Sequence, residues 1–172
     1  AYLDVTAPKI ASPSATATAE AIRARILDET GLTASAGAAP NKFLAKIASD
    51  WNKPDGLFVV APGRIEAFLT PLPVARIPGV GKVMQGRLAE LGVDTVGQLR
   101  EVPRQTLHER FGAFGLRLYE RARGIDERPV QPHQPVQSIS SEDTFAQDLL
   151  LDELEPAIRA LAEKTWAATR KT

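Results

Sequence analysis

The chain has 172 residues, of which 44% are hydrophobic and 24% charged, a composition typical of a soluble globular protein with one domain or two small ones. It contains no cysteine, which excludes disulfides, thiolate zinc sites and cysteine nucleophiles, and no apolar run approaches the length of a membrane span. The 21 basic and 21 acidic residues cancel, but residues 41–128 hold 14 Lys or Arg against 10 Asp or Glu, which weakly favours a nucleic-acid partner.

The first third of the chain predicts alternating strands and helices. Tyr2–Thr6 alternates in polarity and is rich in β-formers, which indicates a strand. Ser12 and Pro13 suit the cap and the first residue of a helix that runs to about Thr30. Gly31 would end that helix, because glycine readily takes the left-handed conformation found after many helices.

A second strand is expected at Leu32–Ala39, a second helix at Asn41–Asn52 and a third strand at Leu57–Val60. The small residues of the second strand would let something approach its backbone closely; the alternative is tight packing under a helix. Together these segments predict a β-α-β-α-β layer, with its sheet covered on at least one face. The expected buried stripe of the second helix is Phe43, Ile47 and Trp51.

Lysines also lie on this second helix. Lys42 and Lys46 are one turn apart, and Asp50 follows after another turn. Their charges alone favour a solvated helix face with a Lys46–Asp50 pair, which contributes only ~0.3–0.5 kcal/mol.

A glycine turn at Ile77–Lys82 is the most distinctive local motif of the chain. Two glycines flank one apolar residue, and the turn runs directly into a predicted helix at 83–91. The backbone N–H groups of such a turn and of the helix start can bind a phosphate, and the final lysine adds a positive charge. With a short helix at 64–69, the pattern is that of a helix-hairpin-helix. The alternative is a corner whose glycines serve geometry alone.

The pattern of short helices and a glycine corner then repeats. Thr95 should cap a short helix that runs to Arg100, and Pro103 should begin another helix towards Phe111. A second glycine-bearing corner follows at 111–115, so we interpret the two corners as degenerate copies of one backbone-binding unit. An arginine-rich helix comes next, for which an ordinary exposed face is the alternative; its arginines are Arg117, Arg121 and Arg123.

The C-terminal part begins with a proline-containing linker at 131–136. Val136–Phe145 indicates a strand, and an apolar stripe from Leu150 to Thr165 indicates a helix. One strand and one helix cannot bury this stripe by themselves, so we expect a domain that is incomplete in these residues. His108 and His133 have no partners at metal-ligand spacing, and we assign them no role.

Five segments resemble Y-family translesion DNA polymerases of the bacterial DNA polymerase IV (DinB) type. They are residues 1–6, 33–56, 77–82, 111–115 and 123–128. The similarity runs in order over nearly the whole chain. It implies an α+β protein of several domains, with a partial palm and an all-helical thumb that carries two helix-hairpin-helix motifs.

The resemblance also implies domain boundaries. Residues 1–53 would be the C-terminal part of the palm, and residues 54–128 the thumb. Residues 129–136 would be the linker, and residues 137–172 the start of the little finger domain. In this layout the chain is a fragment of the polymerase.

The reaction implied by the resemblance is template-directed nucleotidyl transfer with two Mg²⁺ ions, in DNA repair after damage. In the family the metal-binding carboxylates precede the segment matched by Ala1, so this chain alone is predicted to be inactive. Asp4 lies beyond that pair, and we expect it to have a buried or strand-end hydrogen-bonding role. The implied partners are primer-template DNA, a deoxynucleoside triphosphate (dNTP) and a sliding clamp, with no membrane, and the implied location is cytoplasmic.

The resemblance assigns binding roles residue by residue. Lys46 matches a lysine that clamps the nucleotide triphosphate, which replaces the solvated-face interpretation, and Lys42 is a weaker candidate for a DNA or nucleotide contact. No catalytic residue and no metal ligand of the family is matched. The residues expected to bind the DNA backbone are Gly79, Val80, Gly81, Lys82, Gly112 and Gly115.

Two other functions stay open from the sequence. The first is a DNA-binding accessory protein that resembles a polymerase and has lost its carboxylates; the two residues that precede Ala1 in the parent gene distinguish it. The second is a helix-hairpin-helix module fused to an unrelated α/β domain, as in repair nucleases or glycosylases. The intact segment 41–46 favours the polymerase over the accessory protein, and no catalytic lysine–aspartate pairing near the glycine turn supports the fused module.

Overall fold

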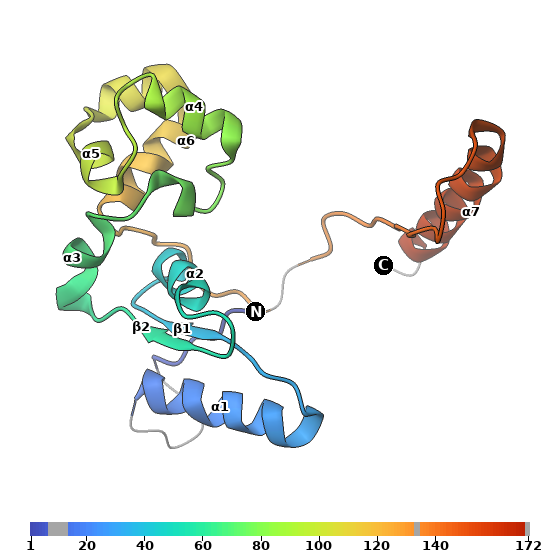
Figure 1. Cartoon of the computed structure of the whole chain (residues 1–172), viewed down its shortest axis with the longest axis horizontal. Helices are drawn as coiled ribbons and strands as arrows, with labels where there is room; N and C mark the ends of the chain where they lie inside the picture. Colours follow the sequence, from blue (N-terminus) through green and yellow to red (C-terminus); the bar gives the residue numbers. More distant parts are fainter. Residues whose placement is uncertain (7–13, 133–134, 171–172) are drawn as a thin grey trace. The chain divides into compact units, whose positions relative to one another are not determined.

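The computed structural model of the chain describes residues 1–6, 14–132 and 135–170. It forms two compact units, residues 1–130 and residues 131–172. The first unit contains a small α/β layer and a helical part, and the second contains one long helix (Figure 1).

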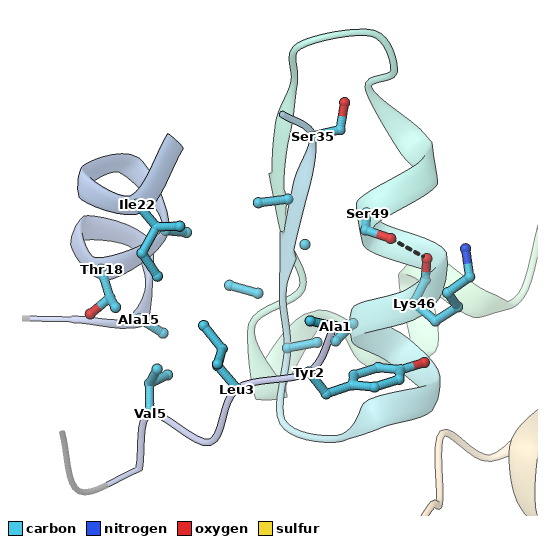
Figure 2. A pocket seen from close by; sticks show the side chains of 16 residues that line it. Ala1, Tyr2, Leu3, Val5, Ala15, Thr18, Ile22, Ser35, Lys46 and Ser49 are labelled. Carbon is cyan, nitrogen blue, oxygen red and sulfur yellow. Dashed lines mark hydrogen bonds between the residues drawn. The ribbon is translucent and has the colours of Figure 1, made fainter. Parts of the chain in front are cut away.

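The α/β layer consists of α1 (Ala15–Thr30), β1 (Ala36–Ala38), α2 (Lys42–Trp51) and β2 (Leu57–Val59). The two strands pair in parallel, and α2 forms the connection between them. The helices α1 and α2 lie on opposite sides of these strands (Figures 1 and 2). The layer therefore confirms the last β-α-β of the prediction, with both faces of the two strands covered.

Local signals determine where these elements begin and end. The Asn41 side chain caps α2 by accepting the Leu44 N–H at 3.0 Å. Gly31 ends α1 in the left-handed conformation, with φ 69°, as predicted. A Cβ on Gly37 of β1 would lie 2.3 Å from the Ser49 backbone nitrogen of α2. At Gly37 the small side chain thus permits tight packing under a helix, which is the alternative stated above.

One strand predicted for this layer is absent, and another is shorter than predicted. Tyr2–Thr6 forms no strand, and the strand predicted at Leu32–Ala39 is present only at Ala36–Ala38. Alternating polarity makes a segment suitable for a sheet, but a strand also needs a partner, and neither described strand pairs with residues 2–6. The predicted cap at Ser12 and Pro13 lies outside the described residues; the described α1 follows the cap Ser14.

The helical part is built from short segments joined by tight turns. Its packing continues that of α2, because Phe43, Leu44 and Ile47 belong to the same buried core as the helical residues. The segments are η1 (Pro62–Arg64), α3 (Ile65–Leu69), η2 (Val74–Arg76), α4 (Lys82–Ala89), α5 (Val96–Glu101) and α6 (Arg104–Ala122). A shared core holds the layer and the helices in one unit.

Most of the predicted helices are present. The helix α5 is capped by Thr95, which with Gln98 forms a capping box. The helix α4 begins at Lys82, one residue earlier than predicted, and the single helical turn η2 lies between α3 and the glycine turn. Trp51 is 44% exposed, so its predicted burial is wrong, although its ring still contacts that of Phe68 with centroids 5.0 Å apart.

The second glycine corner divides α6 into two helices. Gly112 has φ 59° and ψ −141°, which breaks the helical backbone between Phe111 and Ala113. Three residues further on, Gly115 is buried, and a Cβ there would lie 1.8 Å from the Leu107 carbonyl oxygen. Glycine at 112 permits the left-handed corner, and glycine at 115 lets the two halves of α6 meet closely.

In the second unit the stripe from Leu150 to Thr165 lies on α7 (Leu151–Thr169), so the predicted helix is confirmed. The predicted strand at Val136–Phe145 is wrong, because none of the described residues of this unit is in a strand. Ile158 and Trp166 are 61% and 64% exposed. None of the described helices is long and apolar enough to span a membrane.

Candidate nucleic-acid and nucleotide interface

The turn at Ile77–Lys82 is closed by its own backbone. The Val80 N–H donates to the Ile77 carbonyl at 2.9 Å, and both of these side chains are buried in the core. Gly79 has φ +91°, whereas Gly81 has φ −84° and ψ 179°, an extended conformation that any residue can adopt. Only one of the two glycines is therefore required by the backbone conformation of the turn.

Gly81 instead leaves the start of α4 open to solvent. A Cβ at this position would meet no atom of the chain within 4 Å, and Gly81, Lys82 and Val83 are all exposed. No side chain caps α4, so its first N–H groups have no side-chain acceptor. An exposed helix start with these N–H groups and a lysine attracts an anion.

The two glycine corners predicted as copies lie in contact. A Cβ on Gly79 would lie 3.3 Å from the Phe114 ring, which belongs to the second corner. Gly112, with φ 59°, is exposed, but Gly115 is buried. Gly79, Val80, Gly81 and Lys82 thus lie in the first turn, and Gly112 lies at the exposed second corner next to it. Gly115, the sixth residue predicted to bind DNA, is packed inside α6.

Two arginines at the end of α6 make internal contacts: Arg121, and Arg123 directly after the helix. The Arg121 Nη1 donates to the Pro78 carbonyl at 2.7 Å, and the Arg123 Nη2 donates to the Arg100 carbonyl at 2.9 Å. Burial lowers the pKa of Arg121 from its ordinary value, and the nearby Arg128 lowers it further. The interpretation as an ordinary exposed face is therefore wrong for Arg121 and Arg123, which fix the backbone of neighbouring segments.

Lys46 lies on the exposed face of α2 and forms an ion pair with Asp50. Lys53 pairs with the same carboxylate. Hydrogen bonds from Lys46 and Lys53 lower the pKa of Asp50 from its ordinary value. The pair expected from charge is present, and its side chains are 45% and 33% exposed, so a competing anion can reach the ammonium group.

Lys46 also lines a cavity of about 510 Å³ between α1, β1 and α2. Figure 2 shows its surroundings: Ile22 lies on the α1 side and Ser49 on the α2 side, with Tyr2 and Leu3 along the chain that crosses between them. The small residues of β1, Ala36, Gly37 and Ala38, also line the cavity. Lys46 borders this cavity, but Figure 2 shows its ammonium on the side of α2 that faces away from β1 and α1.

Lys42, the weaker candidate, points to different partners. Its Nζ donates to the Pro129 carbonyl at 3.3 Å and lies 5.2 Å from the centre of the Tyr2 ring. These contacts hold the segment after α6 against the start of α2. The side chain is thus engaged within the chain, unlike the backbone N–H groups at the start of α4.

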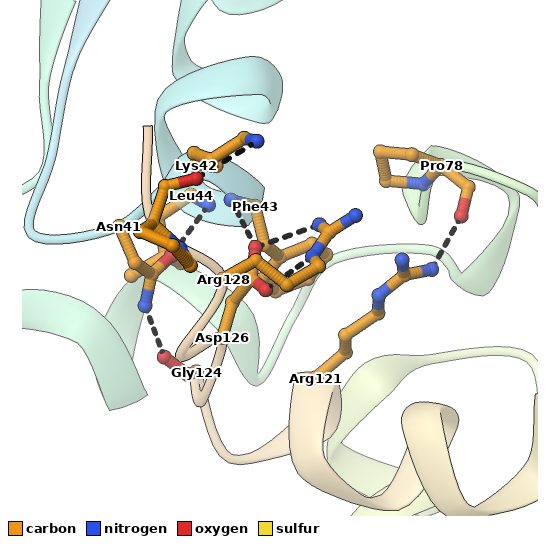
Figure 3. Close-up of polar contacts among 10 residues, drawn as sticks. Asn41, Lys42, Phe43, Leu44, Pro78, Arg121, Gly124, Asp126 and Arg128 are labelled. Atoms are coloured by element: carbon orange, nitrogen blue, oxygen red, sulfur yellow. Dashed lines mark hydrogen bonds and ion pairs between the residues drawn. The ribbon is translucent and has the colours of Figure 1, made fainter. Parts of the chain in front are cut away.

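A second group of contacts at the start of α2 was missed by sequence reasoning. The Phe43 N–H donates to Asp126 Oδ2 at 3.0 Å, and the Asn41 Nδ2 donates to the Gly124 carbonyl at 2.7 Å (Figure 3). Arg128 forms a two-point ion pair with Asp126, which lowers the pKa of this carboxyl from its ordinary value. These partners are 83 residues apart, and no sequence signal at that distance points to them.

The family's two Mg²⁺ ions do not fit the residues present. Across residues 1–6, 14–132 and 135–170, no group of three or more His, Cys, Asp or Glu side chains could hold a metal ion. Asp4 accepts the Thr6 N–H at 2.9 Å, but it is exposed and residues 2–6 form no strand, so the buried or strand-end position expected for it is wrong. No step of the reaction is assigned to a metal in this chain.

Two protein-family models match the chain. The impB/mucB/samB family matches residues 1–50, and the thumb domain of DNA polymerase-iota matches residues 75–126. The first segment includes α2 with Lys46, and the second includes both glycine corners.

Curated relatives and solved structures agree with these matches. The chain is 66% identical over all its 172 residues to DNA polymerase IV of Xanthomonas campestris pv. campestris, and 50% identical over 99% of its length to that of Ralstonia nicotianae. It spans about half the length of these relatives, 48% in both cases.

Among solved structures, a Y-family DNA polymerase chimera gives a TM-score of 0.63 at 35% identity, covering 69% of this chain and 35% of that one. DinB from Sulfolobus solfataricus gives 0.61 at 36% identity, covering 66% and 34%. The identity, the order of the matched segments and the fold all agree. The chain belongs to the Y-family of DNA polymerases.

Proposed function

We propose that this chain is the part of a translesion DNA polymerase that holds the DNA backbone and supplies one lysine to the site of the incoming nucleotide. The uncapped, exposed start of α4 carries the proposal, because it presents N–H groups and Lys82 to solvent within the segment that matches a polymerase thumb. The reaction of the intact polymerase would be template-directed nucleotidyl transfer with two Mg²⁺ ions.

For DNA, the proposed contacts are to phosphates. The N–H groups of Gly81 and Lys82 face no capping side chain, and the ammonium of Lys82 adds a cation at the same place. The Val80 N–H already closes the turn, so a phosphate would have to share it. Contacts of this kind hold a duplex without reading its sequence, as a polymerase requires. Gly79, Gly112 and Gly115 complete the proposed binding residues.

For the nucleotide, we propose that Lys46 leaves Asp50 to neutralise the β- and γ-phosphates. A long, flexible ammonium side chain that is 45% exposed is suited to that task. The two Mg²⁺ ions would be held by carboxylates of the polymerase outside the residues described for this chain. We therefore expect the chain alone not to extend a primer in a Mg²⁺-containing assay; extension above background would contradict this.

The division into palm (1–53), thumb (54–128), linker (129–136) and little finger (137–172) is part of the same proposal. A sliding clamp is the further partner proposed for the longer polymerase, together with primer-template DNA and dNTP. Support comes from the family models, which match a thumb and an N-terminal segment separately.

The experiment that tests the proposal measures binding of the 172-residue chain to a labelled duplex by fluorescence anisotropy. Affinity should fall steeply between two salt concentrations, because phosphate contacts release counterions. Lys82→Ala should weaken binding to unrelated sequences equally and reduce the salt dependence. Arg25→Ala, which removes an exposed cation on α1, is the matched control and should bind as the wild type does. Binding that is independent of salt, or a loss confined to one sequence, would overturn the proposal.

A further inference from the structure

Phe43, near the start of α2, is held from two sides by the C-terminal end of the helical part. Its N–H donates to Asp126 Oδ2 at 3.0 Å, and the Arg121 guanidinium lies 5.7 Å from the centre of its ring. Phe43 itself is 2% exposed, and the Asp126 side chain is 6% exposed. These contacts are therefore shielded from water, where they hold their geometry more firmly than surface pairs do.

The same guanidinium reaches the glycine turn. Arg121 Nη1 donates to the Pro78 carbonyl at 2.7 Å, and a Cβ on Gly79 would lie 3.9 Å from that nitrogen. Figure 3 shows Arg121 extended from α6 towards Pro78, with Asp126 and Phe43 nearby. Arginine suits this position because its plane can face a ring while its edge donates to a carbonyl.

The contact of Asp126 with Phe43 and the contact of Arg121 with Pro78 are linked by the charges of the two side chains. Asp126 is paired with Arg128 through Nε at 2.6 Å and Nη2 at 2.7 Å, and the charges of both residues act on Arg121, that of Arg128 more strongly. Without that carboxylate, two partly shielded cations would repel each other. A change at Asp126 must therefore reach Arg121 as well as Phe43.

We infer that Arg121 and Asp126 are positioning residues that join the glycine turn to the start of α2, with Phe43 as the common contact. The turn and α2 then move as one body. Under the proposed function, the phosphate-binding corner and the helix that carries Lys46 are held at a set separation. The inference itself does not depend on DNA or nucleotide binding.

Amide hydrogen exchange and ¹H–¹⁵N spectra of the whole chain test this. Asp126→Ala should accelerate exchange of the Phe43 N–H on the order of tenfold or more, because a buried hydrogen bond to a charged acceptor is lost. Asp126→Asn keeps an oxygen acceptor, so the Phe43 N–H should exchange more slowly in this variant than in Asp126→Ala. Both variants should also shift the amide signals of Gly79 and Val80, which do not contact Asp126.

The reciprocal variants are Arg121→Gln and the milder Arg121→Lys, which keeps the charge but loses the planar fork. Each should shift the signals of Phe43 and Leu44 as well as those of the turn. Arg104→Gln removes an exposed cation from the first residue of the same helix and should shift neither region.

The inference is overturned if Asp126 variants affect only residues near 41–44 and 124–128, or if Arg121 variants affect only the turn. It is also overturned if exchange accelerates equally at Phe43 and at Leu118, a fully buried core residue, because this would indicate a global loss of stability. The milder variants, Asp126→Asn and Arg121→Lys, keep the test valid if the others fail to fold.

Discussion

Gly115 and Leu107 meet so closely across the corner of α6 that a Cβ on the glycine would lie 1.8 Å from the leucine carbonyl oxygen. Sequence reasoning assigned this glycine to a phosphate-binding corner with Gly112. The packing supplies a sufficient reason for glycine at 115, whereas Gly112 is exposed and has the left-handed backbone that the corner needs.

Gly115→Ala should therefore destabilise the chain by about 1–3 kcal/mol, because the backbone of two helix halves must move apart. Gly86→Ala is the matched control: it lies in α4, is exposed, and its Cβ would meet no atom within 4 Å. That change should stabilise the chain by about 0.5–1 kcal/mol, since alanine is the better helix former. Urea denaturation measures both, and equal midpoints for the two variants would contradict the packing argument.

The features that sequence reasoning predicted correctly depend on neighbours in the chain. Asn41 and Thr95 were predicted at helix starts, and Gly31 at a helix end, because caps act over three or four residues. Tyr2–Thr6 and Val136–Phe145 were wrongly predicted as strands, because a strand depends on a partner that the local pattern does not identify.

In the candidate site, too, contacts between chain neighbours could be predicted from the sequence, whereas contacts between distant residues could not. The Lys46–Asp50 pair follows from helical spacing, and the open turn before Lys82 follows from its glycines. The contact of Phe43 with Asp126 joins residues 83 positions apart, so only the fold reveals it. The resemblance to polymerases supplied the predicted binding residues, and the structure shows that the N–H of one of them, Val80, already closes the turn.

Gly81→Ala separates the two interpretations of the glycine turn. Because Gly81 has φ −84° and open space around its Cβ position, alanine should cost less than about 1 kcal/mol of stability. If a phosphate approaches this backbone, the added methyl group should weaken duplex binding several-fold. Gly63→Ala, at another glycine with open space, should leave binding unchanged. Normal binding by the Gly81 variant would show that no phosphate approaches the backbone at this position.

Under the proposed function, Asp50 competes with a triphosphate for Lys46, because the two side chains form an ion pair. Asp50→Asn removes a negative charge beside the ammonium, so the affinity of the chain for a dNTP should rise by about 2–5-fold, as expected for a partly exposed pair of ~0.5–1 kcal/mol. Lys46→Ala should lower that affinity on the order of tenfold. Titration calorimetry measures both changes. Glu29→Gln, which breaks the comparable pair with Arg25 on α1, is the control and should have no effect. Unchanged affinity in both variants would exclude Lys46 from the nucleotide site.

The pairing of Asp126 with Arg128 predicts a specific dependence of stability on pH. The pKa of Asp126 in the folded chain lies below its ordinary value of 3.8, first because of the hydrogen bonds from Arg128. The folded state therefore binds this proton less readily than the unfolded state does. The contribution of Asp126 to the free energy of unfolding is fully present above the unfolded pKa, and it is lost as the pH falls through the folded pKa.

Asp126→Asn should remove this part of the acid destabilisation, so its free energy of unfolding should fall less steeply than that of the wild type below about pH 4. Glu127→Gln makes the same change in charge at the next residue, which is exposed, and should retain the wild-type slope. Urea denaturation across a pH series measures the three curves. Asp50, whose pKa is also lowered, should leave some slope in all of them. If the Asp126→Asn curve ran parallel to that of the wild type, the carboxylate would not be held in its charged form by Arg128 and the Phe43 N–H.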